Sequence, residues 1–168
     1  MQSKHVFFGG IFLLLNVFFM NMNAQISGMK TGLFDRLSDI GAPEIPGTVC
    51  YIEPSQTYRI TGSGANIWFG NDSFSFLSKK MNGDFILQTQ VQFMGEGHEL
   101  HRKTGIMFRS STSTSSPMVA CTVHGDGLTS LQYRKAERDS VKEVKFVIKG
   151  PDVLQLEKKG NTFITKFI

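Results

Sequence analysis

Polar side chains that could contact sugar hydroxyls recur at alternate positions along several predicted strands. In "DFILQTQVQF" (84–93), glutamines at every second position alternate with mostly apolar residues. Successive strand side chains point to opposite faces, so one face is core and the other is rich in amides. Amides, imidazoles and guanidinium groups supply the donors and acceptors that sugar hydroxyls need. The predicted ligand-binding residues are Trp68, Gln90, Arg109, His124, Gln132 and Arg134, with Gln88, Gln92 and Thr122 on the same kind of face.

The alternative for these residues is an ordinary solvated sheet face with Trp68 in the core. Catalysis is a third interpretation, because hydrolysis of a glycoside uses two carboxyl groups, about 5 Å apart in retaining enzymes. The acids spaced two apart are Glu137 and Asp139, in a predicted charged loop, and the glutamine face supplies none. We therefore expect no enzyme and no catalytic residues.

Metal sites are weakly indicated. His98 and His101 in "GHELH", together with His124 and Asp126, have no spacing typical of a metal centre, which needs three or four ligands in defined geometry. Loop oxygens of Asn71, Asp72 and Asp84 could hold a structural calcium ion, although no acidic loop clusters them. We expect no cofactor and keep structural calcium as the alternative.

The elements that must position these residues are strands. The segment "MVACTVHGDGLTSLQYR" (118–134) predicts a hairpin with a three-residue loop, in which Gly127 takes the left-handed conformation. The register that follows pairs Val119, Cys121 and Val123 with Tyr133, Leu131 and Thr129 on the apolar side. Thr122 and His124 then share the polar side with Ser130, Gln132 and Arg134.

Further strands are predicted on both sides of this hairpin. "TGIMFRS" places Ile106 and Phe108 on a core face, "VKEVKFVIKG" is a strand, and "VLQLEKKGNTFITKF" turns at Gly160 and Asn161. About eight or nine short strands without an internal repeat or an amphipathic helix indicate an all-β, two-sheet antiparallel sandwich. Phe74 and Phe76, alternating with serines, are predicted to fill the space between the sheets.

The N-terminus has the layout of a secretory signal peptide. Lys4 precedes an apolar run from Val6 to Met20, and the small residue Ala24 precedes Gln25. The run is shorter than the roughly 20 residues of a membrane span, so we expect cleavage before Gln25 and no stable membrane anchor. The predicted organisation is a signal peptide (1–24), an irregular lead-in (25–46) and one β-sandwich domain (47–168).

Charge and cysteine content limit the function classes. Without residues 1–24 the chain keeps 17 Lys and Arg against 14 Asp and Glu, a formal charge of +3. These cations are scattered, and nucleic-acid binding would need one basic face with stacking aromatics. Export allows a disulfide between Cys50 and Cys121, but their apolar, β-branched neighbourhoods favour two buried thiols.

A family resemblance covers nearly all of the chain after the signal segment. "DIGAPEIPG", "GSGANIWFGNDSFSF", "HGDGLTSLQYR" and "LQLEKKGNTF" resemble concanavalin A-like jelly-roll modules of exported bacterial proteins, most closely the module that precedes a TolB-like β-propeller. The resemblance implies two curved antiparallel sheets, a fold that lectins and some glucanases share. Such modules continue past the "GNTF" hairpin into a closing strand, so we expect the chain to be truncated at its C-terminal side.

The function expected from the sequence is a non-catalytic module that binds carbohydrate or cell-surface material as part of a larger exported protein, periplasmic or extracellular. One alternative is a structural module that packs against a following β-propeller domain. The other is a glycoside hydrolase that lacks the usual pair of acids. No nucleic acid is expected as a partner.

Overall fold

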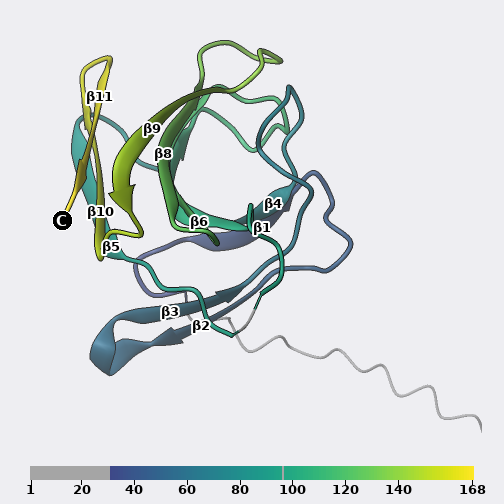
Figure 1. The fold of residues 1–168 in the computed structure, drawn as a ribbon, viewed down its shortest axis with the longest axis vertical. Coiled ribbons are helices and arrows are strands. Elements are labelled where there is room, and N and C mark those ends of the chain that lie inside the picture. Colours follow the sequence, from purple (N-terminus) through teal and green to yellow (C-terminus); the bar gives the residue numbers. More distant parts are fainter. Residues whose placement is uncertain (1–30, 96) are drawn as a thin grey trace, which may run out of the picture.

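The computed structural model describes residues 31–95 and 97–168 and is built of antiparallel strands (Figure 1). In these residues there are eleven strands and one short 3-10 turn, Glu53–Ser55. The strands are β1 (Arg36–Ile40), β2 (Thr48–Ile52), β3 (Thr57–Thr61), β4 (Phe74–Ser78), β5 (Phe85–Gln90), β6 (Lys103–Arg109), β7 (Met118–His124), β8 (Leu128–Arg134), β9 (Lys142–Lys149), β10 (Val153–Lys159) and β11 (Thr162–Phe167).

The largest sheet has the order β6-β7-β8-β9 and contains the predicted central hairpin. β7 and β8 pair with Val119 opposite Tyr133 and Cys121 opposite Leu131, which confirms the predicted register. Gly127 closes the loop with φ +83°, the left-handed conformation that a residue with a side chain would adopt only under strain. The sheet curves strongly, and β10 and β11 lie on its convex side (Figure 1).

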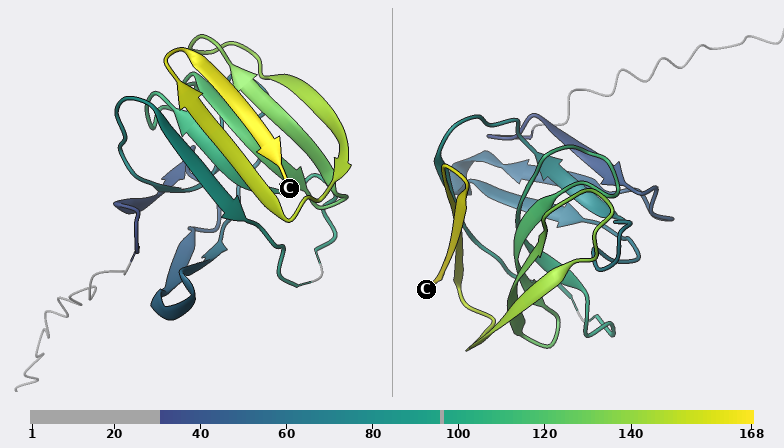
Figure 2. Two further views of the ribbon diagram at one scale, coloured as in Figure 1. Left: turned by 90° about the vertical axis from the view of Figure 1, so that its left-hand side faces the viewer. Right: turned by 90° about the horizontal axis from the view of Figure 1, so that it is seen from above.

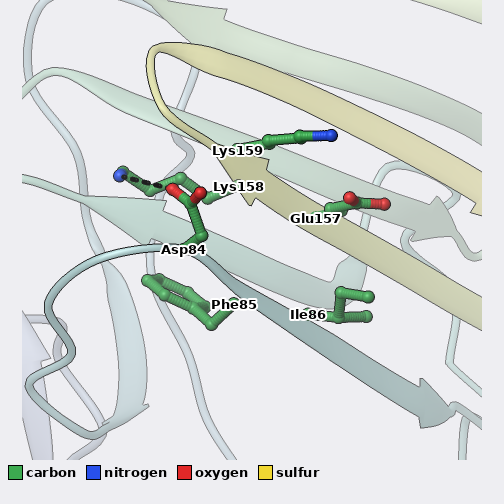
Figure 3. A pocket seen from close by; sticks show the side chains of 6 residues that line it. All are labelled: Asp84, Phe85, Ile86, Glu157, Lys158 and Lys159. Atoms are coloured by element: carbon green, nitrogen blue, oxygen red, sulfur yellow. Dashed lines mark ion pairs between the residues drawn. The ribbon is translucent and has the colours of Figure 1, made fainter.

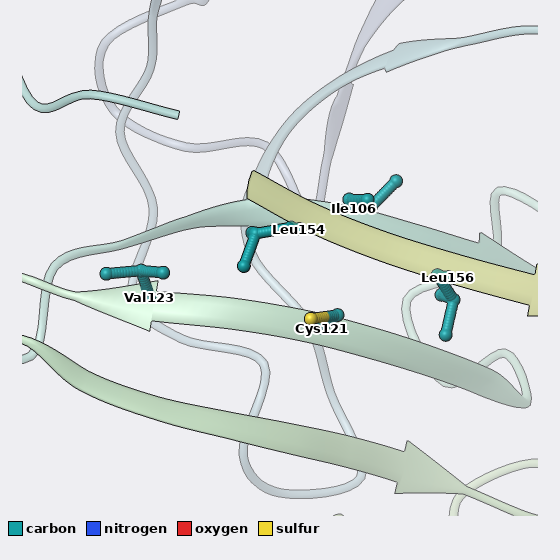
Figure 4. Packing of buried hydrophobic residues seen from close by; sticks show 5 residues of the cluster. All are labelled: Ile106, Cys121, Val123, Leu154 and Leu156. Atoms are coloured by element: carbon teal, nitrogen blue, oxygen red, sulfur yellow. The ribbon is translucent and has the colours of Figure 1, made fainter. Parts of the chain in front are cut away.

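The second sheet, β11-β10-β5, packs on that convex side and encloses the main core (Figure 2). Ile106, Cys121 and Val123 of the first sheet meet Leu154 and Leu156 of β10, all of them nearly or fully buried (Figure 4). These residues occupy alternate strand positions, so the period-two pattern of the sequence placed them on one face. The structure thus confirms the expected all-β antiparallel sandwich.

Two smaller pairs of strands, β1 with β4 and β2 with β3, complete the described chain. Phe74 of β4 packs against a second apolar cluster, formed by Ile67, Met118, Ala120 and Val141 on the other face of the β6–β9 sheet. We call this face, which is turned away from β10, the concave face. It also holds most of the polar residues that the sequence singled out.

Several expectations differ from the structure. The segment predicted as an irregular lead-in contains β1, because its alternating residues pair with β4 from Arg36 opposite Ser78 to Ile40 opposite Phe74. Cys50, predicted to be buried, is exposed, and it lies opposite the exposed Arg59 in the two-stranded β2–β3 pair. Cys121 is buried as expected, and both thiols are free.

The predicted signal peptide lies outside the described residues. In the part of the chain that the structure describes, no helix has the length and apolar character needed to cross a bilayer.

Candidate ligand-binding cleft

The concave face carries rows of residues that the strand register sets side by side. Arg109, Met118 and Arg134 form one row, and Met107, Ala120, Gln132 and Glu143 form the next. Gly105, Thr122, Ser130 and Lys145 follow, and Lys103 lies opposite His124 at the far end. The face therefore has an arginine end, near the start of β7, and a histidine end, near the β7–β8 turn.

The arginine end is closed by a buried ion cluster centred on Asp72. Arg134 makes a bidentate contact, with its Nη2 2.6 Å from Asp72 Oδ1 and its Nη1 2.9 Å from Oδ2. Arg109 Nη2 lies 3.2 Å from Oδ2 of the same carboxylate. The three side chains are 0–2% exposed, so water screens these charges little.

Backbone carbonyls and the Met107 sulfur, which accepts from Arg109 Nη1, bond the other donors of the two arginines. Arg134 donates to the carbonyls of Phe69, Ser116 and Asp139, and Arg109 donates to those of Ser111 and Ser113. Burial lowers the pKa of Arg109, and the charge of Asp72 opposes that change. The loops before β4, before β7 and after β8 thus meet over these guanidinium groups.

This arrangement corrects the expectation that Arg109 and Arg134 project from an exposed face. Both lie on the predicted side of their strands, but the loops and Asp72 cover that side. The sequence pattern correctly gave the strand face on which the arginines lie. It could not show that Asp72, about 60 positions from Arg134 in the chain, covers that face. Neither arginine is presented to a ligand in this structure.

The histidine end is open and forms a cleft of about 310 Å³. In the row next to Lys103 and His124, the residues Gly105, Thr122 and Ser130 are small, which leaves space above the strands. A side chain at Gly105 would place its Cβ 2.0 Å from the Cys121 carbonyl oxygen, so only glycine fits there. The cleft is lined by Asn66, Trp68, His101, Lys103, His124, Leu128, Glu143 and Lys145.

A buried hydrogen-bond chain runs from His124 through Gln132 to Glu143. Gln132 Nε2 donates to Glu143 Oε1 at 3.0 Å and lies 3.4 Å from His124 Nε2. An amide nitrogen only donates, so His124 Nε2 accepts in this arrangement and the ring proton sits on Nδ1. Among the described residues, neither His124 Nδ1 nor Gln132 Oε1 has a hydrogen-bond partner, although both atoms are buried.

Unpartnered buried polar atoms cost about 1–3 kcal/mol each, and native proteins contain few of them. This end of the face therefore keeps one donor and one acceptor that no described residue of the protein bonds. The arginine end, by contrast, has its side-chain donors satisfied.

Burial and neighbouring charges set the protonation of the cleft. Burial and the charge of Lys103 lower the pKa of His124, which favours a neutral imidazole. Burial raises the pKa of Glu143, but hydrogen bonds from Gln132 and Ser130 outweigh it and hold that pKa below its usual value. The cleft thus presents a neutral histidine beside an ionised carboxylate.

Trp68 and Lys103 form one side of the cleft. The Val141 N–H donates to the Trp68 carbonyl at 3.1 Å, which fixes the tryptophan backbone against the sheet. Lys103 Nζ donates to Asn66 Oδ1 at 2.5 Å and lies 5.9 Å from the centre of the Trp68 ring. Trp68 is half-buried, partly against the second apolar cluster and partly in the cleft.

The structure brings together three of the six predicted binding residues. Trp68 and His124 line the cleft, and Gln132 bonds to His124 beside it. Gln90 lies elsewhere, because β5 belongs to the second sheet and its glutamines face outward from the convex side. Alternation along a strand tells which side chains share a face of that strand, but not which sheet the strand joins.

The suggested calcium ligands are also apart. Asp72 is held by the two arginines, whereas Asp84 accepts from the Gly160 N–H at 2.7 Å at one end of the second sheet. Within residues 31–95 and 97–168, no three His, Cys, Asp or Glu side chains gather closely enough to hold a metal ion.

A second hollow, of about 430 Å³, lies at that end of the second sheet (Figure 3). Its lining includes Asp84 and Lys158, which approach to 4.0 Å and are 59% and 30% exposed. An exposed pair of this kind contributes little energy, and none of the unpartnered buried atoms lies in this lining. We therefore take the smaller cleft on the concave face as the candidate site.

The residues predicted from the sequence to bind a ligand did not include Asn66, His101, Lys103, Leu128, Glu143 or Lys145, which line the cleft. Glu143 and Lys145 alternate in the predicted strand "VKEVKFVIKG", so their pattern could have placed them on one face. Asn66 and His101 come from loops, and His101 lies 6.1 Å from His124, measured between ring centres. Nothing in the spacing of Asn66, His101 and His124 along the chain indicates that they lie at the same cleft.

Comparisons of the chain with models of protein families, with curated proteins and with solved structures find no significant match.

Proposed function

We propose that this protein is a non-catalytic module that binds carbohydrate in the concave-face cleft. The observation that supports it is the His124–Gln132–Glu143 chain, in which one buried donor and one buried acceptor have no partner among the described residues, beside the half-buried Trp68. Sugars combine hydroxyl groups, which both donate and accept, with apolar ring faces that pack on aromatic side chains. Few polar groups converging beside an apolar surface are typical of a small-ligand site.

Binding fits the cleft better than hydrolysis does. Glycoside hydrolysis uses two carboxyl groups on either side of the scissile bond. The described lining of the cleft supplies one carboxylate, Glu143, and it already accepts hydrogen bonds and pairs with Lys145 at 3.7 Å. The proposal therefore gives Glu143 a role in orienting its neighbours and a ligand, and not in proton transfer.

Trp68 provides a direct test because it is the single tryptophan of the chain. Its fluorescence should change when the 168-residue chain is titrated with a binding oligosaccharide from a glycan screen. Trp68→Ala removes the ring, and we expect at least about a tenfold weaker affinity, measured by calorimetry, because about 1.4 kcal/mol corresponds to a factor of ten.

Phe69→Ala is the matched control, since Phe69 is the neighbouring aromatic residue, is 70% exposed and does not line the cleft. Trp68→Phe keeps an aromatic ring and should bind with intermediate affinity. Melting curves show whether each variant is folded. If no glycan binds, or if Trp68→Phe and Trp68→Ala both bind as the wild type does, the proposal is wrong.

A second candidate function, packing against another domain of a larger exported protein such as a β-propeller, is favoured by exposed apolar residues. Val147 is fully exposed, and Val144, Ile148, Phe163 and Ile164 are 37–46% exposed on β9 and β11. Large apolar side chains exposed on strand faces mark candidate interaction sites. Val147→Asp and Ile164→Asp should then abolish that packing without affecting glycan binding, as measured by co-purification with the neighbouring domain.

A further inference from the structure

Lys103 is a partly buried cation at the cleft whose contacts are with neutral groups. Its Nζ donates to the amide oxygen of Asn66 at 2.5 Å and faces the Trp68 ring. In the described part of the chain no carboxylate forms an ion pair with it. Glu143 acts on it only at longer range.

The other charges of the concave face are matched. Arg109 and Arg134 share Asp72, and Lys145 pairs with Glu143 at 3.7 Å. Glu143 is further occupied by the hydrogen bond from Gln132. Among the described residues, Lys103 therefore stands apart as a positive charge without a carboxylate ion pair, at the mouth of a cleft that His124 also lines.

Partial burial makes this charge costly. Water stabilises an exposed ammonium group, and burial removes part of that stabilisation, which lowers the pKa of Lys103. A bound anion would restore favourable interactions, and a charge-assisted hydrogen bond in such a place is roughly twice as strong as a neutral one.

We propose that the ligand of the cleft is an acidic carbohydrate, whose carboxylate binds Lys103 Nζ while the adjoining sugar ring lies against Trp68. The inference rests on the proposed function and narrows it to glycans that carry an anionic group. The neutral hydroxyls of the same sugar lie beside His124, which lines the cleft. Lys145, on the strand at the opposite edge of the sheet, also lines the cleft and lies where a longer acidic chain would continue.

The test compares matched ligands on the full 168-residue chain, with Trp68 fluorescence and calorimetry as readouts. Oligogalacturonides are the acidic probe and galactose oligosaccharides of the same length and linkage are the neutral one. Galactose oligosaccharides bearing sulfate distinguish a requirement for carboxylate from a requirement for negative charge alone. We expect the acidic probe to bind at least about tenfold more tightly than the neutral probe at low salt, and the preference to shrink as salt is added.

Lys103→Met should remove that preference while retaining the weaker binding of the neutral probe. Lys142→Met is the control, because Lys142 is exposed on the same sheet with its side chain on the other face from Glu143, and it should change neither affinity. Lys103→Arg keeps the charge and should keep the preference, which separates loss of charge from loss of fold. Melting curves of all variants accompany the titrations.

Neutral binding without an acidic preference would overturn the inference and leave the proposed function standing. An acidic preference that survives Lys103→Met would also overturn it, because the charge would then be recognised elsewhere. Tighter binding of the sulfated probe than of the uronate would overturn the assignment to a carboxylate. No binding of any probe would overturn both the inference and the proposed function.

Discussion

The two ends of the concave face are built on the same four strands and differ in what lies above them. At the arginine end, the loops before β4, before β7 and after β8 bring Asp72 and several backbone carbonyls onto Arg109 and Arg134. At the histidine end, Gln132 bonds to both His124 and Glu143, and two buried polar atoms have no partner among the described residues.

The difference shows that a polar strand face is not by itself a binding surface. Guanidinium groups were the most ligand-like residues in the sequence, yet they hold the loops to the sheet. The open end instead has a neutral imidazole and an amide. Each forms weaker hydrogen bonds than a guanidinium group, but the cleft beside them leaves space for a ligand. A polar side chain on this face can bind a ligand only where no loop residue already forms hydrogen bonds or ion pairs with it.

The largest expected effect is at the closed end, where Asp72→Asn removes the carboxylate from two buried arginines. Breaking a buried ion pair from one side costs about 3–5 kcal/mol, because the remaining charges lose their compensation. We expect a large fall in the free energy of unfolding, measured by urea denaturation. Asp152→Asn, at an exposed position, is the control and should have little effect.

Arg109 and Arg134 extend this test, because both were predicted from the sequence to bind a ligand on a polar strand face. The structure reverses that expectation, and Arg134→Ala should also destabilise strongly. A melting temperature unchanged by Asp72→Asn would mean that the ion cluster does not hold the loops, and the contrast between the two ends would disappear.

A smaller effect is expected at the open end when the pH is lowered. Burial and the charge of Lys103 lower the pKa of His124 in the folded state, so the unfolded state binds a proton more readily. Stability from the neutral His124 is then fully present above about pH 6.5, the usual histidine value, and is lost as the pH falls below it. Melting temperatures measured from about pH 7.5 down to about pH 5.5 should show this decline.

The His124→Gln variant should lose most of that pH dependence, while His98→Gln, in an exposed loop, should retain it. The charges that act on His124 are those of Lys103, Glu143, Asp126 and His101, so their variants would shift the profile. Stability that rises on acidification through this range would contradict a buried neutral histidine.

The smallest effect is expected for Gln90→Ala on the outer face of the second sheet. Its side chain is exposed and lies on the other sheet from the cleft, so the free energy of unfolding should change by no more than about 0.5 kcal/mol. Glycan affinity should stay the same in calorimetry. Weaker binding by Gln90→Ala would place the ligand on the second sheet and not on the concave face.

Much of the local architecture could be predicted from the sequence. The β7–β8 hairpin, its register and the turn at Gly127 follow from alternation and from one glycine, and the structure agrees at each of these points. The turn between β10 and β11 at Gly160 and Asn161 follows in the same way. These features depend on neighbours in the chain, which is why local patterns were sufficient.

The candidate site was only half predicted. Trp68, His124 and Gln132 were singled out by residue type and strand position, but Asn66 and His101 come from loops without a regular period. Gln90 was grouped with them because period-two alternation is the same for strands of either sheet. Nothing in the local pattern separated the two sheets.

By itself, the sequence determined which residues share a strand face, because a strand turns each successive side chain to the opposite side. It also determined the hairpin turns, because glycine tolerates positive φ. Only the tertiary structure decided which faces are covered and by what. Asp72 reaches Arg134 across 62 positions of the chain, and Lys103 meets Asn66 across 37. Such contacts depend on how sheets and loops pack together, and that packing closes one end of the concave face and leaves the other open.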